Sequence, residues 1–266
     1  MAIISVSGYI GSGKDLVTKV IQYLDFKEKI GDEDYSNFEN IHDKHGFRLI
    51  LTETSWENKK WADALKEVAS LLTGIPRADF EKIEVKNSCL GPEWYYYKIS
   101  NNERIFDEKF LTLKEAEDYI ENNLFGMNLE PVLWKMTVRE LLQRCGTEAM
   151  RHGLHQNVWV NALMSKYKIK EETVYSGDGI KTYNDYPNWI ISDTRFYNEL
   201  NAVKSKGGIC IRVNRDDNKT TSTHPSEREL DDAEFDYVIQ NNTGEIQKLI
   251  YDVREILIKE KLLSAS

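Results

Sequence analysis

A glycine-rich segment near the N-terminus combines residue types that suit phosphate binding. Gly8, Gly13 and Lys14 match the spacing G-x-x-x-x-G-K, and Gly11 lies between them. Glycine tolerates positive φ and carries no side chain, so such a loop can turn its backbone N–H groups towards phosphate oxygens. Lys14 can then reach the outer phosphates of a nucleoside triphosphate. We therefore predict a phosphate-binding loop, against the alternative of an ordinary turn between a strand and a helix.

The position after the lysine departs from the common pattern. Asp15 stands where a Ser or Thr normally ligates Mg²⁺, and Leu16 rather than a hydroxyl residue follows it. The next hydroxyl, that of Thr18, comes one helical turn later. The loop therefore lacks a hydroxyl beside the usual metal position.

A second group of polar residues recurs at helical spacing. Arg139, Gln143, Gly146 and Thr147 lie at offsets of 0, 4, 7 and 8, on one predicted helix face. A cation, an amide, a hydroxyl and a patch of bare backbone on one face could recognise a phosphate and a base edge. Glycine inside a helix costs about 1 kcal/mol relative to alanine, which indicates a packing or ligand role for Gly146. The alternative is a solvated face.

Charged residues also follow two predicted strands. Asp193 and Arg195 come directly after an apolar segment at 189–192, and Arg215 follows a strand at 209–213. In an open parallel sheet, ligands bind at the carboxyl ends of the strands. An acid and an arginine at such an end suit Mg²⁺–phosphate chemistry.

The elements that must position these residues alternate between strand and helix. This alternation predicts one α/β domain over residues 1–266, with three layers and a mainly parallel sheet. A hairpin at 94–106 and a helix that begins at the capping box Thr112–Glu115 predict an insertion at about 91–130. We interpret 168–187 as a loop and the long polar segment 214–234 as lid-like.

Composition narrows the function classes. The 266 residues carry a net charge of −9, and no basic run is visible, so binding to polymeric nucleic acid is not expected. No apolar run of about 18 residues is present, which argues against a membrane protein. The chain also shows no secretory signal, and its three cysteines are scattered, which favours a reducing, cytoplasmic location.

Several segments together resemble one enzyme family, the bacteriophage deoxynucleoside monophosphate kinases. The resemblance covers most of the chain except roughly 25–45 and 91–130. Its motifs are SGYIGSGKD at 7–15, KKWADALKEVASLLTG at 59–74, TVRELLQRCGTEAMR at 137–151, SDTRFYNEL at 192–200, GGICIRVNR at 207–215 and HPSERE at 224–229.

The resemblance implies a P-loop kinase of the nucleoside monophosphate kinase type. Such an enzyme transfers the γ-phosphoryl group of ATP to a deoxynucleoside monophosphate with Mg²⁺, in the host cytoplasm if a phage encodes it, and a homodimer is expected. Its implied catalytic residues are Lys14, Arg139, Asp193 and Arg195. ATP would be held by Gly11, Ser12, Gly13, Lys14, Asp15 and, on our own interpretation of the strand end, Arg215. Asp15 would also serve as the Mg²⁺ ligand. The monophosphate would be held by Arg139, Gln143, Gly146, Thr147, Trp159, Asp193, Arg195 and Glu199.

Two other readings stay open at this point. A related P-loop kinase could act on another phosphorylated acceptor, such as phosphomevalonate. A nucleotide-binding switch protein is disfavoured, because the chain has no N-K-x-D motif and 193–196 is not D-x-x-G.

Overall fold

A computed structural model describes residues 2–32, 34–38, 46–101, 104–176, 179–216 and 228–264, with only the backbone described for residues 46 and 170–184. The chain divides into two compact units: Met1–Asp63 with Asn157–Ser266, and Ala64–Gln156. The predicted insertion at 91–130 lies inside the second unit, and we propose that it is an insertion into one kinase domain. Of the predicted lid-like segment, residues 217–227 lie outside the described part.

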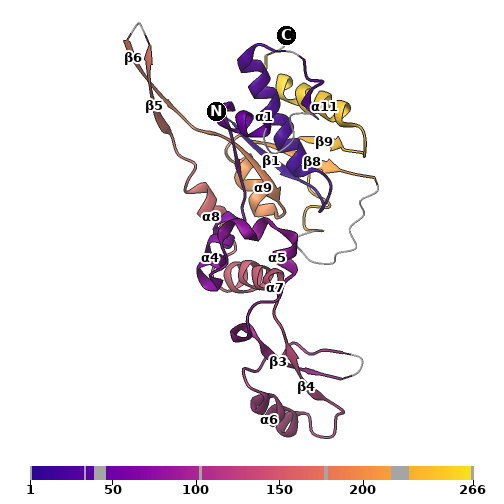
Figure 1. Cartoon of the computed structure of the whole chain (residues 1–266). Coiled ribbons are helices and arrows are strands. Elements are labelled where there is room, and N and C mark those ends of the chain that lie inside the picture. Colours follow the sequence, from indigo (N-terminus) through magenta and orange to yellow (C-terminus); the bar gives the residue numbers. More distant parts are fainter. Residues whose placement is uncertain are drawn as a thin grey trace. The chain divides into compact units, whose positions relative to one another are not determined.

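A five-stranded sheet forms the centre of the first unit. Its order is β2-β7-β1-β8-β9, and every neighbouring pair is parallel. The strands are β1 (Ile3–Ser7), β2 (Trp56–Lys59), β7 (Asn188–Thr194), β8 (Ile209–Asn214) and β9 (Tyr237–Gln240). β1 is central, so the loop that follows it emerges at the middle of the carboxyl edge (Figure 1).

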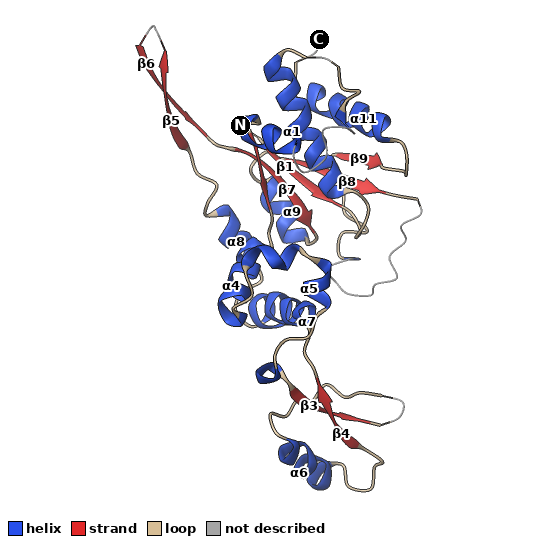
Figure 2. Ribbon diagram, in the orientation of Figure 1, coloured by secondary structure: helices blue, strands red, loops and turns tan. Residues whose placement is uncertain are grey.

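Helices cover both faces of this sheet, which gives the predicted three-layer α/β fold (Figure 2). One face packs on α1 (Lys14–Ile30), α3 (Gly46–Glu53) and α11 (Ile246–Lys259), and the other on α8 (Val158–Met164) and α9 (Tyr197–Lys204).

Strand residues alternate between these two cores because successive side chains point to opposite faces. Ile4 and Ile190 enter the first core, whereas Ile3, Trp189 and Ile191 enter the second. All five are nearly inaccessible to solvent. Both faces of β1 and β7 are therefore buried, as expected of a parallel sheet that is covered on both sides.

The second unit is mostly helical and carries one small sheet. Its elements are α4 (Asp63–Thr73), the 3₁₀ helix Arg77–Glu81, α5 (Ile83–Asn87), the 3₁₀ helix Pro92–Trp94, β3 (Tyr96–Ser100), α6 (Leu113–Asn123), β4 (Glu130–Trp134), α7 (Val138–Gln143) and a π-helix at Arg144–His152. Thr112 and Glu115 form the predicted capping box at the start of α6. Ala69, Phe80, Leu90, Tyr96 and Val138 belong to its core.

Two predictions of local structure were wrong. Strand β3 pairs antiparallel with β4, and the expected return strand at 104–106 supplies only a single bridge between Ser100 and Ile105. The segment predicted as a loop at 168–187 forms the hairpin β5 (Lys170–Ser176) and β6 (Gly179–Asp185). The partner of β3 lies beyond α6 in the sequence, so local composition does not reveal it. The strands β5 and β6 are adjacent in the sequence and were missed because their polar composition favoured a loop.

The helix at 138–152 also differs from the expected one. Its first part, α7, is α-helical, but from Arg144 the turns widen into a π-helix. A π-helix closes i→i+5 hydrogen bonds, so the α-helical offsets of 7 and 8 no longer place residues on one face. Gly146 is accordingly buried, while Gln143 is exposed.

Candidate active site

The glycine-rich segment forms a tight loop between β1 and α1. Gly11 and Gly13 have φ values of 81° and 98°, a region that other residues adopt only with strain. Gly13 is the N-cap of α1, which therefore begins directly at Lys14. The helix presents its positive N-terminal end to the loop, the arrangement by which helices bind phosphate.

Residues that follow β8 and β9 support this loop. The buried Asn241 donates from Nδ2 to the Ser12 carbonyl at 2.8 Å. A Cβ built on Gly13 would lie only 2.0 Å from that Nδ2, so a larger residue does not fit. Arg215 donates to the Gly11 carbonyl at 3.1 Å and also to Thr243 Oγ1. The predicted ATP-binding residue Arg215 thus lies against the loop.

Two polar groups of the loop suit a phosphate ligand. Lys14 Nζ donates to the carbonyls of Gly8 and Tyr9 at 2.6 and 2.7 Å, so the ammonium group is held over its own loop. Ser12 Oγ is buried and has no hydrogen-bond partner within the described part of the chain. A buried hydroxyl without a partner is unfavourable, and a phosphate oxygen would satisfy it.

Tyr9, also in the loop, contacts two residues that are distant in the sequence. Its hydroxyl donates to Asp231 Oδ1 at 2.6 Å, and its ring lies 4.8 Å from the guanidinium of Arg212. The hydrogen bond to Asp231 raises the pKa of Tyr9, because it stabilises the neutral phenol. Arg212 also donates to Ser7 Oγ at 3.2 Å and pairs with Asp231 at 3.4 Å, so this arginine braces the loop.

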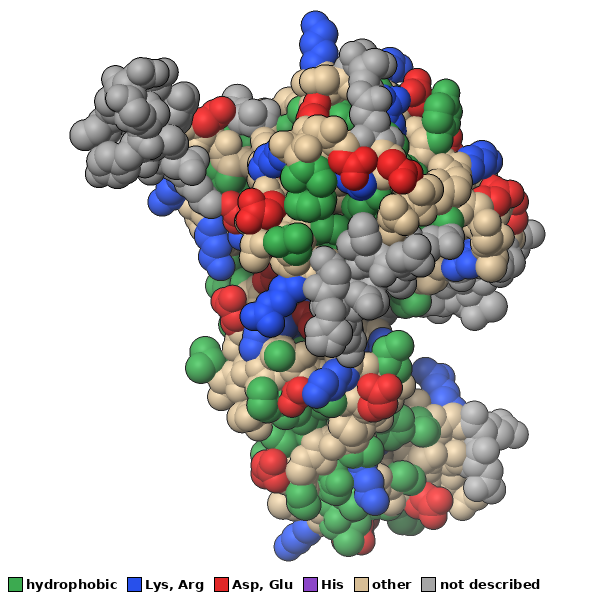
Figure 3. Space-filling model, turned by 45° about the horizontal axis from the view of Figure 1, so that its top comes forward, with side chains coloured by type: hydrophobic (Ala, Val, Ile, Leu, Met, Phe, Trp, Pro, Cys, Tyr) green, Lys and Arg blue, Asp and Glu red, His purple; other side chains and the backbone are tan. Residues whose placement is uncertain are grey.

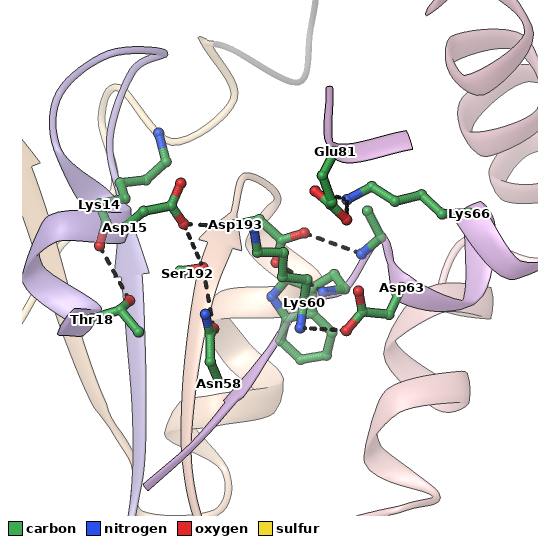
Figure 4. A network of polar contacts seen from close by, with 12 residues as sticks. Lys14, Asp15, Thr18, Asn58, Lys60, Asp63, Lys66, Glu81, Ser192 and Asp193 are labelled. Carbon is green, nitrogen blue, oxygen red and sulfur yellow. Dashed lines mark hydrogen bonds and ion pairs between the residues drawn. The ribbon is translucent and has the colours of Figure 1, made fainter. Parts of the chain in front are cut away.

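Asp15 lies among polar groups from two neighbouring strands (Figure 4). Ser192 at the end of β7 places Oγ 3.3 Å from Asp15 Oδ1 and 3.4 Å from Asn58 Oδ1 on β2. Lys60 Nζ lies 3.6 Å from the same carboxylate oxygen. Oxygen donors of this kind are the ligands that Mg²⁺ prefers.

Asp193 points away from this group and holds the backbone beyond β2. Its two carboxylate oxygens accept from the N–H groups of Trp61 at 2.8 Å and Ala62 at 3.1 Å. Desolvation by burial raises the pKa of Asp193, although these two hydrogen bonds and the charges of Arg195 and Lys60 oppose the shift. The contacts make Asp193 an anchor for the segment that leads into α4.

Glu199 has a similar anchoring contact at the next turn. Its Oε2 accepts from the backbone N–H groups of Arg195 at 2.8 Å and Phe196 at 3.2 Å, and the side chain is almost fully buried. This caps the start of α9 and fixes the course of the backbone at Arg195. Trp159 is buried within α8, at 6% exposure.

The second unit holds the other predicted substrate residues. Arg139 is exposed and donates from Nε and Nη2 to Asn87 Oδ1 at 3.1 and 3.0 Å. A Cβ on Gly146 would lie 2.8 Å from Leu65 Cδ2, so this glycine allows the π-helix to pack closely on α4. Gln143 is exposed and Thr147 half-buried, so the four residues do not share one environment.

The described surface agrees with the acidic composition. On the face in Figure 3, Lys and Arg side chains are interspersed with Asp and Glu rather than gathered into one basic stripe. Among the described residues, no helix is both long and apolar enough to cross a membrane.

Comparison with known proteins defines the family. A family model described as deoxynucleotide monophosphate kinase matches residues 2–253. The chain belongs to this family. A putative deoxynucleotide monophosphate kinase of Acanthamoeba polyphaga mimivirus is 28% identical over 144 residues, which cover 51% of this chain and 65% of the relative. The deoxynucleotide monophosphate kinase of Enterobacteria phage T4 is 26% identical over 153 residues, which cover 58% of this chain and 57% of that protein.

The matched stretches thus leave a large part of these relatives uncovered. Across the mimivirus, T4 and Escherichia phage RB69 proteins they span 65%, 57% and 45% of the relatives' lengths. The resemblance inferred from the motifs is confirmed at the level of the family.

Three polar residues beside Asp15 were not predicted from the sequence: Asn58, Lys60 and Ser192. Asn58 and Ser192 lie near the carboxyl ends of β2 and β7, and Lys60 directly follows β2. Ser192 was within a predicted strand, and its position one residue before Asp193 was the available signal. Lys60 lies in the family motif at 59–74 but was given no role there. The strand at 56–59 was not predicted, so nothing marked Asn58.

Proposed function

We propose that the chain is a deoxynucleoside monophosphate kinase that transfers the γ-phosphoryl group of ATP to a deoxynucleoside monophosphate, giving ADP and the diphosphate. The observation that carries the proposal is the loop at Gly8–Asp15, where positive-φ glycines, Lys14 and the start of α1 converge in a member of this family. Its expected setting is the cytoplasm, and a homodimer is the expected assembly. Polymeric nucleic acid and membranes are not expected partners.

Positioning and charge neutralisation supply most of the catalysis in phosphoryl transfer. Lys14 would leave the carbonyls of Gly8 and Tyr9 and hold the outer phosphates of ATP. The loop N–H groups, Ser12 Oγ and Arg215 would complete the donor side. Asp15 would hold Mg²⁺, which would supply further neutralisation of the phosphate charge.

The phosphate of the monophosphate acceptor requires cationic side chains rather than a general base. Its phosphate oxygen is already anionic, so no proton must be removed before attack. We assign Arg139 and Arg195 to the acceptor phosphate, because both arginines can make bidentate contacts with phosphate. Gln143, Gly146, Thr147 and Trp159 are proposed to contribute to the nucleoside side. Asp193 and Glu199 would act through the backbone that they hold.

A coupled ADP-release assay tests the proposal. ATP is offered with each deoxynucleoside monophosphate, each ribonucleoside monophosphate and phosphomevalonate. We expect turnover well above ATP alone with at least one deoxynucleotide, and loss of that turnover in Lys14→Ala. Turnover with phosphomevalonate only would replace the proposal by the other acceptor class, and no stimulation by any acceptor would refute it.

A pair of arginine variants tests the acceptor assignment. Arg139→Ala is expected to raise KM for the monophosphate while KM for ATP stays unchanged, because Arg139 is proposed to touch only the acceptor. Arg77→Ala is the matched control, since Arg77 pairs with Glu81 at 2.8 Å in the same unit. Unchanged acceptor kinetics in Arg139→Ala would remove Arg139 from the site.

A further inference from the structure

The hydroxyl of Ser192 lies beside the carboxylate of Asp15 at the carboxyl edge of the sheet (Figure 4). Ser192 lies near the carboxyl end of β7, whose parallel neighbour β1 leads into the phosphate-binding loop. The Oγ–Oδ1 distance is 3.3 Å, and the serine is only 2% exposed whereas the Asp15 side chain is 74% exposed. The pair thus combines a fixed hydroxyl with a carboxylate that can move.

A hydroxyl and a carboxylate are the usual protein ligands of Mg²⁺ in P-loop enzymes, but here the two types occupy each other's positions. The common arrangement takes a Ser or Thr hydroxyl from the position after the P-loop lysine and a carboxylate from the end of a nearby strand. In this chain the carboxylate, Asp15, follows the lysine, and a hydroxyl, Ser192, lies near the carboxyl end of β7. The carboxylate next to it in sequence, Asp193, is engaged by two backbone N–H groups.

The spacing of the oxygens fits a shared cation. Octahedral Mg²⁺ binds oxygen at about 2.1 Å, which separates neighbouring ligand oxygens by about 3 Å. The observed 3.3 Å requires a shift of only a few tenths of an ångström, which the exposed Asp15 side chain can make. Asp15 Oδ1 already faces a cation, because Lys60 Nζ lies 3.6 Å away.

The single proton of Ser192 decides how the hydroxyl is presented. Ser192 Oγ contacts two acceptors, Asp15 Oδ1 and Asn58 Oδ1 at 3.4 Å, but it has only one hydrogen to donate. When that hydrogen points to Asn58, a lone pair of Oγ and the Asp15 carboxylate face the same space. Asn58 then acts as a positioning residue for a metal ligand.

We infer that Ser192 is a direct ligand of the nucleotide-bound Mg²⁺, together with Asp15, and that Asn58 orients its hydroxyl. The inference rests on the proposed function only in that the chain binds a metal–nucleotide complex. Ser192 would thus supply the hydroxyl ligand that position 15 does not offer.

Metal binding is measured without turnover. Mn²⁺ replaces Mg²⁺, and free Mn²⁺ is followed by electron paramagnetic resonance as it is titrated into the full chain with saturating ADP. Ser192→Ala is expected to weaken Mn²⁺ binding at least about tenfold, because removal of even an outer-shell partner costs roughly 10- to 100-fold in metal affinity. ADP binding without metal should stay at the wild-type level.

Thr18→Val is the matched control. It also removes a buried hydroxyl near the loop, but Thr18 Oγ1 donates to the Lys14 carbonyl within α1 at 3.2 Å. Its Mn²⁺ affinity is expected to match the wild type. Equal Mn²⁺ affinity in Ser192→Ala and wild type would overturn the inference.

Ser192→Cys separates direct ligation from a structural role. A thiolate prefers soft metals, so this variant should bind Cd²⁺ more tightly than the wild type and Mn²⁺ more weakly. Unchanged Cd²⁺ affinity would also overturn the inference. Failure of the proposed function would look different: the wild-type chain would bind Mn²⁺ with ADP yet phosphorylate none of the acceptors.

Discussion

Replacement of Gly13 by alanine tests whether backbone conformation and the Asn241 contact together fix the phosphate-binding loop. Two penalties are expected in the folded chain. The φ of 98° strains any residue with a Cβ, at about 1–2 kcal/mol. The new Cβ would also lie 2.0 Å from Asn241 Nδ2 and displace the donor that serves the Ser12 carbonyl.

The second penalty can be estimated from the buried hydrogen bond. Loss of a partner for a buried polar group costs about 1–3 kcal/mol. Gly13→Ala is therefore expected to lower the free energy of unfolding by about 2–5 kcal/mol. Gly31→Ala is the matched control: Gly31 has a φ of 69°, and a Cβ there meets no atom within 4 Å, so only the strain of about 1–2 kcal/mol applies.

Urea unfolding without nucleotide measures these values in a double-mutant cycle with Asn241→Ala. In the Asn241→Ala background the clash is gone, so Gly13→Ala should cost only the strain that Gly31→Ala reports. An equal cost of Gly13→Ala in both backgrounds would refute the role of Asn241. A cost no larger than that of Gly31→Ala in the wild-type background would refute it as well.

Three further predictions concern contacts within the two units. Glu140→Ala should destabilise the second unit by about 1–3 kcal/mol, because the half-buried Trp134 Nε1, which donates to Glu140 at 2.8 Å, loses its acceptor. Urea unfolding followed by circular dichroism measures this, and an unchanged midpoint would contradict it. Burial raises the pKa of the Cys210 thiol to about 12, above the usual 9.0. The thiol therefore ionises at lower pH in the unfolded chain, and the free energy of unfolding falls as pH rises from about 9 to 12. Cys210→Ala should flatten this decline when unfolding is measured at several pH values. The same slope of unfolding free energy against pH in both proteins would argue against it. Gly146→Ala should cost about 1–3 kcal/mol, because its Cβ would lie 2.8 Å from Leu65 Cδ2. In a double-mutant cycle, Leu65→Ala should reduce the loss of unfolding free energy caused by Gly146→Ala. Full additivity of the two substitutions would show that the new Cβ does not clash with Leu65.

The sequence determined the loop and the order of elements around it. The spacing of Gly8, Gly13 and Lys14 is local information, because a glycine-rich turn between a strand and a helix forms from residues adjacent in the chain. The apolar strands and amphipathic helices likewise predicted a parallel α/β sheet with helices on both faces. These features depend on periodicity within one segment, which a single sequence shows directly.

The sequence did not predict how certain strands pair or that one helix widens. The hairpin β5–β6 and the pairing of β3 with β4 require a partner strand, and polar composition at 168–187 favoured a loop instead. Because the helix widens into a π-helix at Arg144–His152, Arg139 and Thr147 do not share the helix face that was predicted for them.

The site shows the same division. From the sequence, Asp193 was the strand-end acid and Ser192 only part of the preceding strand. In the structure, Asp193 accepts the N–H groups of Trp61 and Ala62, and Ser192 faces Asp15 instead. The types of residue around the loop could thus be read from the chain. Which of two consecutive side chains faces Asp15 was decided by the sheet, because neighbouring residues on a strand face opposite sides.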